Sequence, residues 1–238
     1  MEKPERMKRF YQNVTTADSE GGWQVLLDGR PIKTVGGRPQ IVPCAALAEA
    51  MAAEWASQGP EISAGAFILR DLADYAIDVV GTDRAGAIGQ IMPYGETDTL
   101  CYRADDHDPL HLRQDAVWEP LLSAAERRFD ARFERVSGII HRPQPVATLA
   151  RLEAALIAET DCRLAALRTL AGLAASLVIA LAAIERKSDL AMLWNAANLE
   201  EDWQAEFWGK DAEAQARQER RRVQFMAAAQ FAQLSQAD

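Results

Sequence analysis

The chain has 238 residues, of which 49% are hydrophobic and 26% are charged. It is long enough to bury one large core or two smaller ones, and domain sizes favour two compact units. The formal net charge of −9 and the pI of about 5.0 create a field that repels phosphate backbones and anionic lipid headgroups. The composition therefore disfavours nucleic acid and membrane surfaces as partners.

Three features of the sequence bear on its compartment. Cys44, Cys101 and Cys162 have long gaps between them, which fit neither a disulfide framework nor a zinc site, so we expect reduced thiols. Residues 1–6 lack the character of a signal peptide or of an organellar presequence. The uncharged run 169–184 is shorter than the ~20 residues of a spanning helix. We expect a bacterial cytoplasmic protein without membrane insertion, or a processed form.

In chain order, the first predicted structure is a small antiparallel meander. Its strands are predicted in three short runs separated by turns: 23–27, 30–34 and 40–42. The turn dipeptide Asp28-Gly29 is typical of tight hairpins. Pro31 cannot donate a hydrogen bond to a neighbouring strand, so its strand lies at an edge or begins at Pro31.

Helical patterns dominate after residue 45. Breaker-free runs that alternate with Gly, Pro or capping residues predict helices over 45–57, 69–80, 109–133, 146–161, 163–184, 189–207 and 212–234. Asp108 and Pro109 are a typical helix start, and Gly209 is a typical helix end. The interval 137–145 breaks the helical pattern. Pairing of extended segments, as in a short sheet, is an alternative around residues 133–140.

These patterns predict an α+β fold. A small N-terminal domain of antiparallel strands with helices is expected over residues 1–80, followed by a larger all-helical domain over residues 81–238. Trp55 lies in an Ala-rich helical run and Trp118 among apolar neighbours, so both are predicted to anchor cores.

A search for catalytic motifs finds no nucleophile. The glycines at positions 81, 86 and 89 lack the Lys-Ser/Thr ending of a phosphate-cradling loop. The sequence has no serine nucleophile elbow, and no cysteine has an activating sequence context. The sequence therefore disfavours nucleotide hydrolysis and gives little support to an enzyme.

His107 and His111 are one alternative site, because the i, i+4 spacing on a single helix suits a metal ion. Pro109 argues against it, since a helix that begins there leaves His107 outside. A solvated helix start, with acidic residues that match the helix dipole, is the simpler interpretation. An enzyme or metal-binding protein that uses this pair stays open as an alternative.

A second candidate site is the acidic part of the predicted helix 189–207. Its carboxylates are Glu200, Glu201, Asp202 and Glu206. Glu201 shares a helix face with Leu193, Ala197 and Trp208. The cluster fits a buried general acid, a recognition surface or a solvated charged face. The arginines of the last helix (217, 220, 221 and 222) fit an acidic partner or intrahelical ion pairs, and the pairs are favoured.

Four stretches together carry a specific pattern. They are residues 9–11 (Arg-Phe-Tyr), 27–34 (Leu-Asp-Gly-Arg-Pro-Ile-Lys-Thr), 97–103 (Thr-Asp-Thr-Leu-Cys-Tyr-Arg), and 199–204 (Leu-Glu-Glu-Asp-Trp-Gln) followed by Trp208-Gly209. In this order, the sequence resembles the family of ATP synthase assembly factors that chaperone the alpha subunit of the catalytic sector. The resemblance covers nearly the entire chain.

The resemblance implies an assembly chaperone that binds the unassembled ATP synthase alpha subunit, with no cofactor and no reaction. We expect a monomer that shields the subunit interface of alpha until beta replaces it. The predicted partner-binding residues are Glu200, Glu201, Gln204 and Trp208, which combine hydrogen-bonding groups with aromatic contact area on one helix. A general scaffold protein that binds another partner is the remaining alternative, and only the family resemblance argues against it.

Overall fold

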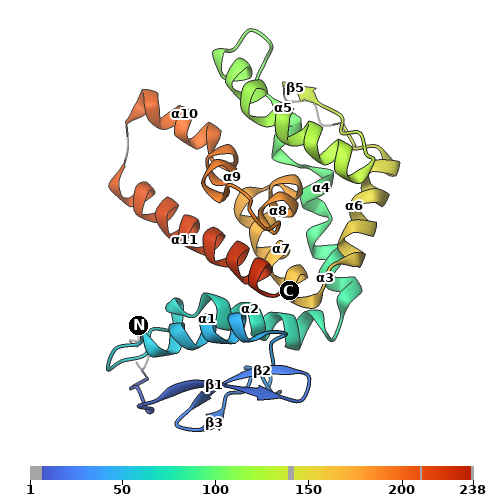
Figure 1. Cartoon of the computed structure of the whole chain (residues 1–238). Helices are drawn as coiled ribbons and strands as arrows, with labels where there is room; N and C mark the ends of the chain where they lie inside the picture. Colours follow the sequence, from blue (N-terminus) through green and yellow to red (C-terminus); the bar gives the residue numbers. More distant parts are fainter. Residues whose placement is uncertain (1–6, 139–141, 210, 237–238) are drawn as a thin grey trace.

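The structure is a computed structural model that describes residues 7–138, 142–209 and 211–236, without the side chain of Trp208. The N-terminal part contains a three-stranded antiparallel sheet of order β1-β2-β3. Its strands are β1 (Val14–Ser19), β2 (Gly22–Leu27) and β3 (Arg30–Pro31). The sheet lies at one end of the molecule, below α1 (Ala45–Ala56) in the view of Figure 1.

The predicted hairpin between β2 and β3 is confirmed. Leu27 pairs with Arg30, and the turn residues Asp28 and Gly29 have φ angles of 49° and 79°, as a tight hairpin turn requires. Val25 and Leu27 are buried, at 1% and 6% exposure. β1 was not predicted, because its sequence Val-Thr-Thr-Ala-Asp-Ser carries little hydrophobic alternation. In the predicted third run, Val42 forms only an isolated bridge to Trp23.

The sheet is joined to the helical part through α1 and α2. After α1 the chain forms a 3-10 turn (Ala64–Ala66), α2 (Ile68–Tyr75) and a π-helical turn (Ala76–Val80). α2 and the π-helical turn pack against the helices α7 (Asp161–Ala174) and α11 (Ala212–Leu234). A single hydrophobic cluster therefore extends from Tyr11 to Ala232. The predicted domain division at residues 80 and 81 stays a prediction.

The remaining chain is mainly helical, so the predicted α+β fold is confirmed. Its elements before α7 are α3 (Arg84–Ile91), α4 (Pro93–Glu96), a 3-10 turn (Thr99–Cys101), β4 (Tyr102–Arg103), α5 (Pro109–Phe129), β5 (Val136–Ser137) and α6 (Val146–Ala158). After α7 come α8 (Leu177–Ala183), α9 (Leu190–Ala197) and α10 (Leu199–Trp208). α7 lies in the centre of this part (Figure 1). The short strands β4 and β5 pair in parallel, which agrees with the extended pairing considered around residues 133–140.

Two predicted helices are broken in the structure. The predicted helix 163–184 divides at Ala175, which has φ 48°, and at Ser176, whose hydroxyl accepts a hydrogen bond from the Ile179 N–H at 3.0 Å. The predicted helix 189–207 divides at Asn198, whose side chain donates to the Trp194 carbonyl at 2.8 Å. α3 and α4 were not predicted, since their sequence contains Gly and Pro.

The predicted start of α5 agrees with the structure, but its end lies four residues before the predicted residue 133. α5 begins after Asp108, whose carboxylate accepts from the Leu110 N–H at 2.8 Å, and ends at Asp130 with φ 50°. Trp55 and Trp118 are buried, at 8% and 0% exposure, as predicted. Among the described residues, no helix has the length and apolar character to cross a bilayer.

Candidate partner-binding site

The acidic helix belongs to an exposed part of the structure that we call the α10–α11 arm, residues 199–209 and 211–224. Figure 1 shows α10 and the start of α11 extending away from the sheet, with the end of α10 and the start of α11 at the edge of the molecule. Arm residues of α11 before Phe225 are exposed or half-buried, whereas Phe225 and Phe231 are fully buried. The second half of α11 therefore docks on the body, and the first half projects from it.

A cleft of about 400 Å³ lies between the two helices of the arm. It is lined by polar and small residues: Glu201, Asp202, Gln204, Ala205, Gly209, Asp211, Ala214, Gln215 and Gln218. Gly209 ends α10 with φ 83°, a conformation that strongly favours glycine. The turn allows α11 to begin beside α10, with Asp211 as its capping residue at 2.9 Å from the Ala214 N–H.

Glu201 and Gln204, two of the predicted partner-binding residues, line this cleft. The Glu201 carboxylate accepts from the Arg221 guanidinium at 3.1 Å, with side-chain exposures of 58% and 38%. Arg221 also donates to the Leu173 carbonyl at 3.0 Å, which fixes this part of α11 to α7. Gln204 is exposed and its amide forms no hydrogen bond with another described residue. The two predicted residues thus give the cleft one paired carboxylate and one amide that has no hydrogen-bond partner among the described residues.

Glu200, the third predicted residue, is directed to α5 instead. Its carboxylate accepts from the Gln114 side-chain amide at 2.7 Å. Gln114 is fully buried, and its amide oxygen accepts from the Ala104 N–H at 2.7 Å. Glu200 therefore anchors α10 to the body. Trp208, the fourth, is the last residue of α10, and its side chain lies outside the described part of the structure.

Phe207, which lies beside Trp203 on α10, was not singled out from the sequence. Phe207 is 67% exposed, and its ring lies 5.0 Å from that of Trp203. The Arg113 guanidinium stacks 5.4 Å from the Trp203 ring and pairs with Glu206 at 2.8 Å. The Trp-x-x-x-Phe spacing was the available signal, because residues at i and i+4 share a helix face. The arm therefore offers apolar area on the side of α10 that contacts Arg113 of α5, in addition to the cleft, which neither ring lines.

The acidic helix does not have the environment of a buried general acid. Glu200, Glu201 and Glu206 are exposed and Asp202 is half-buried. Asp202 accepts from the Gln218 amide at 3.1 Å. Burial raises the pKa of Cys162 to about 12 and also raises the pKa of Cys101, so neither thiol is a thiolate nucleophile at neutral pH. The geometry favours recognition over catalysis.

The histidine pair does not share a helix, so the premise of the metal site is wrong. His107 is exposed in the turn before α5. The Nδ1 of His111 lies 2.8 Å from the Ala104 carbonyl, and its Nε2 lies 3.2 Å from the Asp115 carboxylate. Both ring nitrogens of His111 are therefore engaged. No cluster of three or more His, Cys, Asp or Glu side chains suited to a metal ion occurs within the described ranges.

Comparisons with known proteins agree with the resemblance carried by the sequence. The family model described as ATP12 chaperone protein matches residues 8–126. The crystal structure of Atp12 from Paracoccus denitrificans is 34% identical, with a TM-score of 0.89, and covers 97% of this chain and 99% of that chain. The Atu1473 protein from Agrobacterium tumefaciens is 38% identical, with a TM-score of 0.90, over 96% of this chain and 85% of that chain. The chain belongs to the ATP12 chaperone family, which confirms its resemblance to assembly chaperones of the F-type ATP synthase.

Proposed function

We propose that the protein binds the unassembled alpha subunit of the ATP synthase and shields its subunit interface until beta replaces the chaperone. Membership of the ATP12 chaperone family supports the role in assembly. A free subunit of an obligate complex exposes apolar area that aggregates readily. A protein that covers this area acts as a placeholder, without cofactor or reaction. Its place of action is the bacterial cytoplasm, or the mitochondrial matrix for an organellar form.

The observation that supports this proposal best is the α10–α11 arm. It combines a polar cleft of about 400 Å³ with the exposed ring of Phe207. The chaperone must bind alpha strongly enough to prevent self-association of alpha, and weakly enough that beta can displace the chaperone. An interface with one aromatic contact and a polar surround suits that balance better than a fully apolar one.

Glu201 suits the exchange because its present interaction costs little to break. Both members of the Glu201–Arg221 pair are partly exposed, and such pairs contribute about 0–1 kcal/mol. A cationic group of the alpha subunit can therefore replace Arg221 as the partner of Glu201 with a small net penalty. The Gln204 amide adds a donor and an acceptor one helical turn away.

Size-exclusion chromatography with isolated alpha and beta subunits tests the proposal. We expect co-elution with alpha, and release of the chaperone when beta is added. Glu201→Lys should weaken binding of alpha by at least about tenfold, since it places a like charge beside Arg221 and any cationic partner. Glu153→Lys is the matched control, because Glu153 is exposed on α6, away from the arm.

Two results would contradict the proposal. The first is retention of beta in place of alpha. The second is equal binding of alpha by both variants, which would place the contact outside the cleft. Light scattering on the same samples measures the mass of the free protein, for which we propose a monomer, and of a one-to-one complex.

A further inference from the structure

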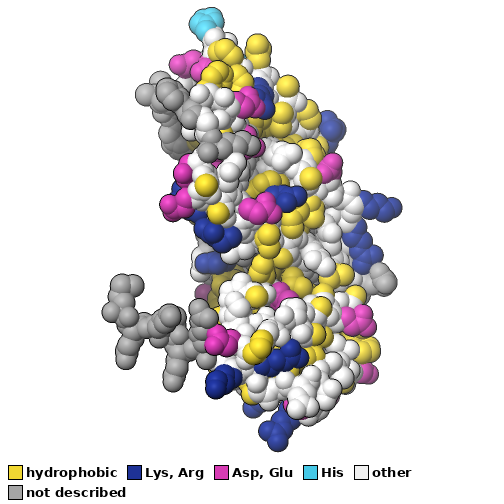
Figure 2. Space-filling view, turned by 90° about the vertical axis from the view of Figure 1, so that its left-hand side faces the viewer, with side chains coloured by type: hydrophobic (Ala, Val, Ile, Leu, Met, Phe, Trp, Pro, Cys, Tyr) yellow, Lys and Arg dark blue, Asp and Glu magenta, His cyan; other side chains and the backbone are white. Residues whose placement is uncertain are grey.

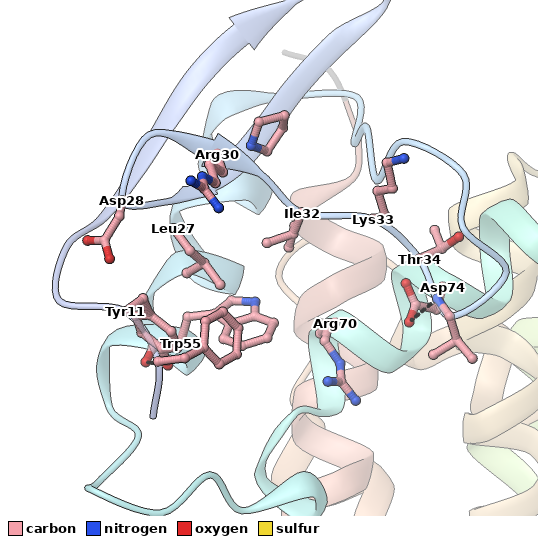
Figure 3. Close-up of a pocket in the computed structure, with 13 residues that line it drawn as sticks. Tyr11, Leu27, Asp28, Arg30, Ile32, Lys33, Thr34, Trp55, Arg70 and Asp74 are labelled. Carbon is pink, nitrogen blue, oxygen red and sulfur yellow. Dashed lines mark hydrogen bonds between the residues drawn. The ribbon is translucent and has the colours of Figure 1, made fainter. Parts of the chain in front are cut away.

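A second concave surface lies in the N-terminal part, remote from the α10–α11 arm. This pocket has a volume of about 620 Å³. It opens between the β2–β3 hairpin, the loop that follows β3, and the helices α1 and α2 (Figure 3). The volume exceeds that of one side chain and falls within the range of ligand sites, about 300–1,000 Å³. We call it the hairpin pocket.

The base of the hairpin pocket is apolar and rigid. Tyr11, Leu27 and Trp55 line it and are only 4%, 6% and 8% exposed. The Tyr11 hydroxyl donates to the Trp55 carbonyl at 2.6 Å, and the two rings meet edge to face at 5.5 Å. At the rim, Phe10 and Val35 are 65% and 87% exposed. Large apolar side chains at a rim favour an apolar ligand group.

One buried donor in the pocket wall has no acceptor. The indole N–H of Trp55 forms no hydrogen bond within the described residues, although the atom is inaccessible to solvent. Most buried donors in proteins have a hydrogen-bond partner. Figure 3 shows the Trp55 ring beside Tyr11, with Leu27 and Ile32 on the adjacent side of the pocket. Because this nitrogen is closed off from the pocket, Trp55 contributes only apolar ring surface to the base.

The charged side chains that line the pocket differ in whether other groups of the protein bind them. Asp28 accepts from the backbone N–H groups of Gln12 and Asn13, and Asp74 accepts from the Gln40 amide at 2.5 Å. The cations Arg30 and Lys33 are exposed, and neither forms an ion pair with a described residue. Both carboxylates thus accept hydrogen bonds from the protein itself, while Arg30 and Lys33 are exposed around an apolar base. Such an arrangement is complementary to an anionic ligand.

We propose that the hairpin pocket binds a short extended peptide segment of another protein, in which a large apolar side chain adjoins a carboxylate. The apolar side chain packs on Tyr11 and Leu27, and the carboxylate lies against Arg30 and Lys33. A free phosphate would match the cations and leave the apolar base unused. The site is separate from the proposed contact of the arm with alpha.

Fluorescence anisotropy with synthetic peptides tests this proposal without any ATP synthase subunit. The probe is a labelled, acetylated Gly-Asp-Phe-Leu-Glu-Gly peptide. Its controls are the amide peptide Gly-Asn-Phe-Leu-Gln-Gly and the polar peptide Gly-Asp-Ser-Ser-Glu-Gly. We expect each control to bind at least about fivefold more weakly than the probe, because each removes one of the two complementary features.

Matched variants locate the binding site. Arg30→Gln with Lys33→Gln should raise the Kd of the probe by about tenfold, and both positions are exposed, so the variant should fold. Arg127→Gln with Lys187→Gln makes the same change in charge at exposed positions outside the pocket and should leave the Kd unchanged. In ¹H–¹⁵N spectra, the Trp55 indole signal, assigned with Trp55→Phe, should move when the probe is added.

Several results would overturn the proposal. They are equal binding of the probe and the amide peptide, an unchanged Kd in the Arg30/Lys33 variant, and an immobile Trp55 indole signal. Displacement of the probe by inorganic phosphate at equal concentration would indicate an anion site instead of a peptide site. Because no alpha subunit is present, these outcomes are independent of whether the arm binds alpha.

Discussion

The central helices α7 and α8 and the α10–α11 arm are built from segments of similar length with opposite environments. In α8, six of the residues Leu177–Ala183 are buried. In α10, Leu199 is the sole buried position among those whose side chains are described. Figure 2 shows a face of the molecule on which apolar and charged side chains are interspersed. The difference indicates that the buried side chains of the centre determine the fold, whereas the exposed side chains of the arm are available for binding a partner.

The two regions are also held by different interactions. Burial of a large side chain in the centre contributes about 1.5–3 kcal/mol. The arm is tied to the body by partly exposed pairs, such as Arg113–Glu206 at 2.8 Å, each worth about 0–1 kcal/mol. Substitutions in the two regions should therefore separate cleanly into changes of stability and changes of binding.

Trp118→Ala should give the largest effect on stability. The side chain is fully buried and its indole N–H donates to the Ala196 carbonyl at 2.8 Å. Loss of the ring leaves a cavity and an unpaired carbonyl, which should lower the free energy of unfolding by about 3–5 kcal/mol. Urea titration followed by circular dichroism measures the change. A loss below about 1 kcal/mol would show that the region around Trp118 does not determine the fold.

Asp98 gives the centre a specific pH dependence. It is fully buried, and burial raises its pKa from 3.8 to about 6, although hydrogen bonds from the Val178 N–H, Ser176 and the Leu100 N–H act in the opposite direction. Between pH 3.8 and about 6 the folded state binds more protons than the unfolded state, so stability from this group falls as the pH rises.

Asp98→Asn isolates that contribution, because Asn does not titrate. The free energy of unfolding of the wild type minus that of Asp98→Asn should be greater at about pH 4.5 than at about pH 7.5, by about 2 kcal/mol. Denaturant titrations of both proteins at the two pH values measure it. A difference that is constant, or that grows with pH, would mean that the hydrogen bonds outweigh the burial.

Ala175→Gly should stabilise the junction between α7 and α8. Ala175 has φ 48°, where a Cβ atom is unfavourable and glycine is preferred. Its carbonyl accepts from the Thr99 N–H at 3.1 Å, so the backbone position is fixed. We expect a gain of up to about 1 kcal/mol, measured as a higher Tm. A loss of stability would indicate that the methyl group contributes packing that outweighs the backbone strain.

The same junction explains what the sequence could and could not predict of the fold. The α+β class, the Asp28-Gly29 hairpin and the last helix follow from turn residues and helical periods. The break at Ala175 carries no such signal, since alanine is the best helix former, and tertiary contacts with Thr99 impose it. The strand β1 was missed because it is stabilised mainly by hydrogen bonds to β2. A local sequence pattern does not contain that pairing.

The candidate sites show a parallel limit. The sequence pattern and family resemblance placed Glu201 and Gln204 on one helix, and both line the cleft. They did not show that Glu200 is turned to Gln114, because that contact joins segments far apart in the chain. The hairpin pocket was missed for the same reason. Tyr11, Leu27 and Trp55 meet only after the sheet packs on α1.

Phe207→Ala should give the smallest effect on stability and the clearest separation between the two regions. The side chain is 67% exposed, so its loss should change the free energy of unfolding by no more than about 0.5 kcal/mol. An exposed aromatic side chain is a typical binding anchor, and its removal should weaken binding of alpha by about tenfold or more. Parallel Tm and chromatography measurements with Trp118→Ala compare the two regions. A fall in stability above about 1.5 kcal/mol would place Phe207 with the core and remove the distinction on which the role of the arm rests.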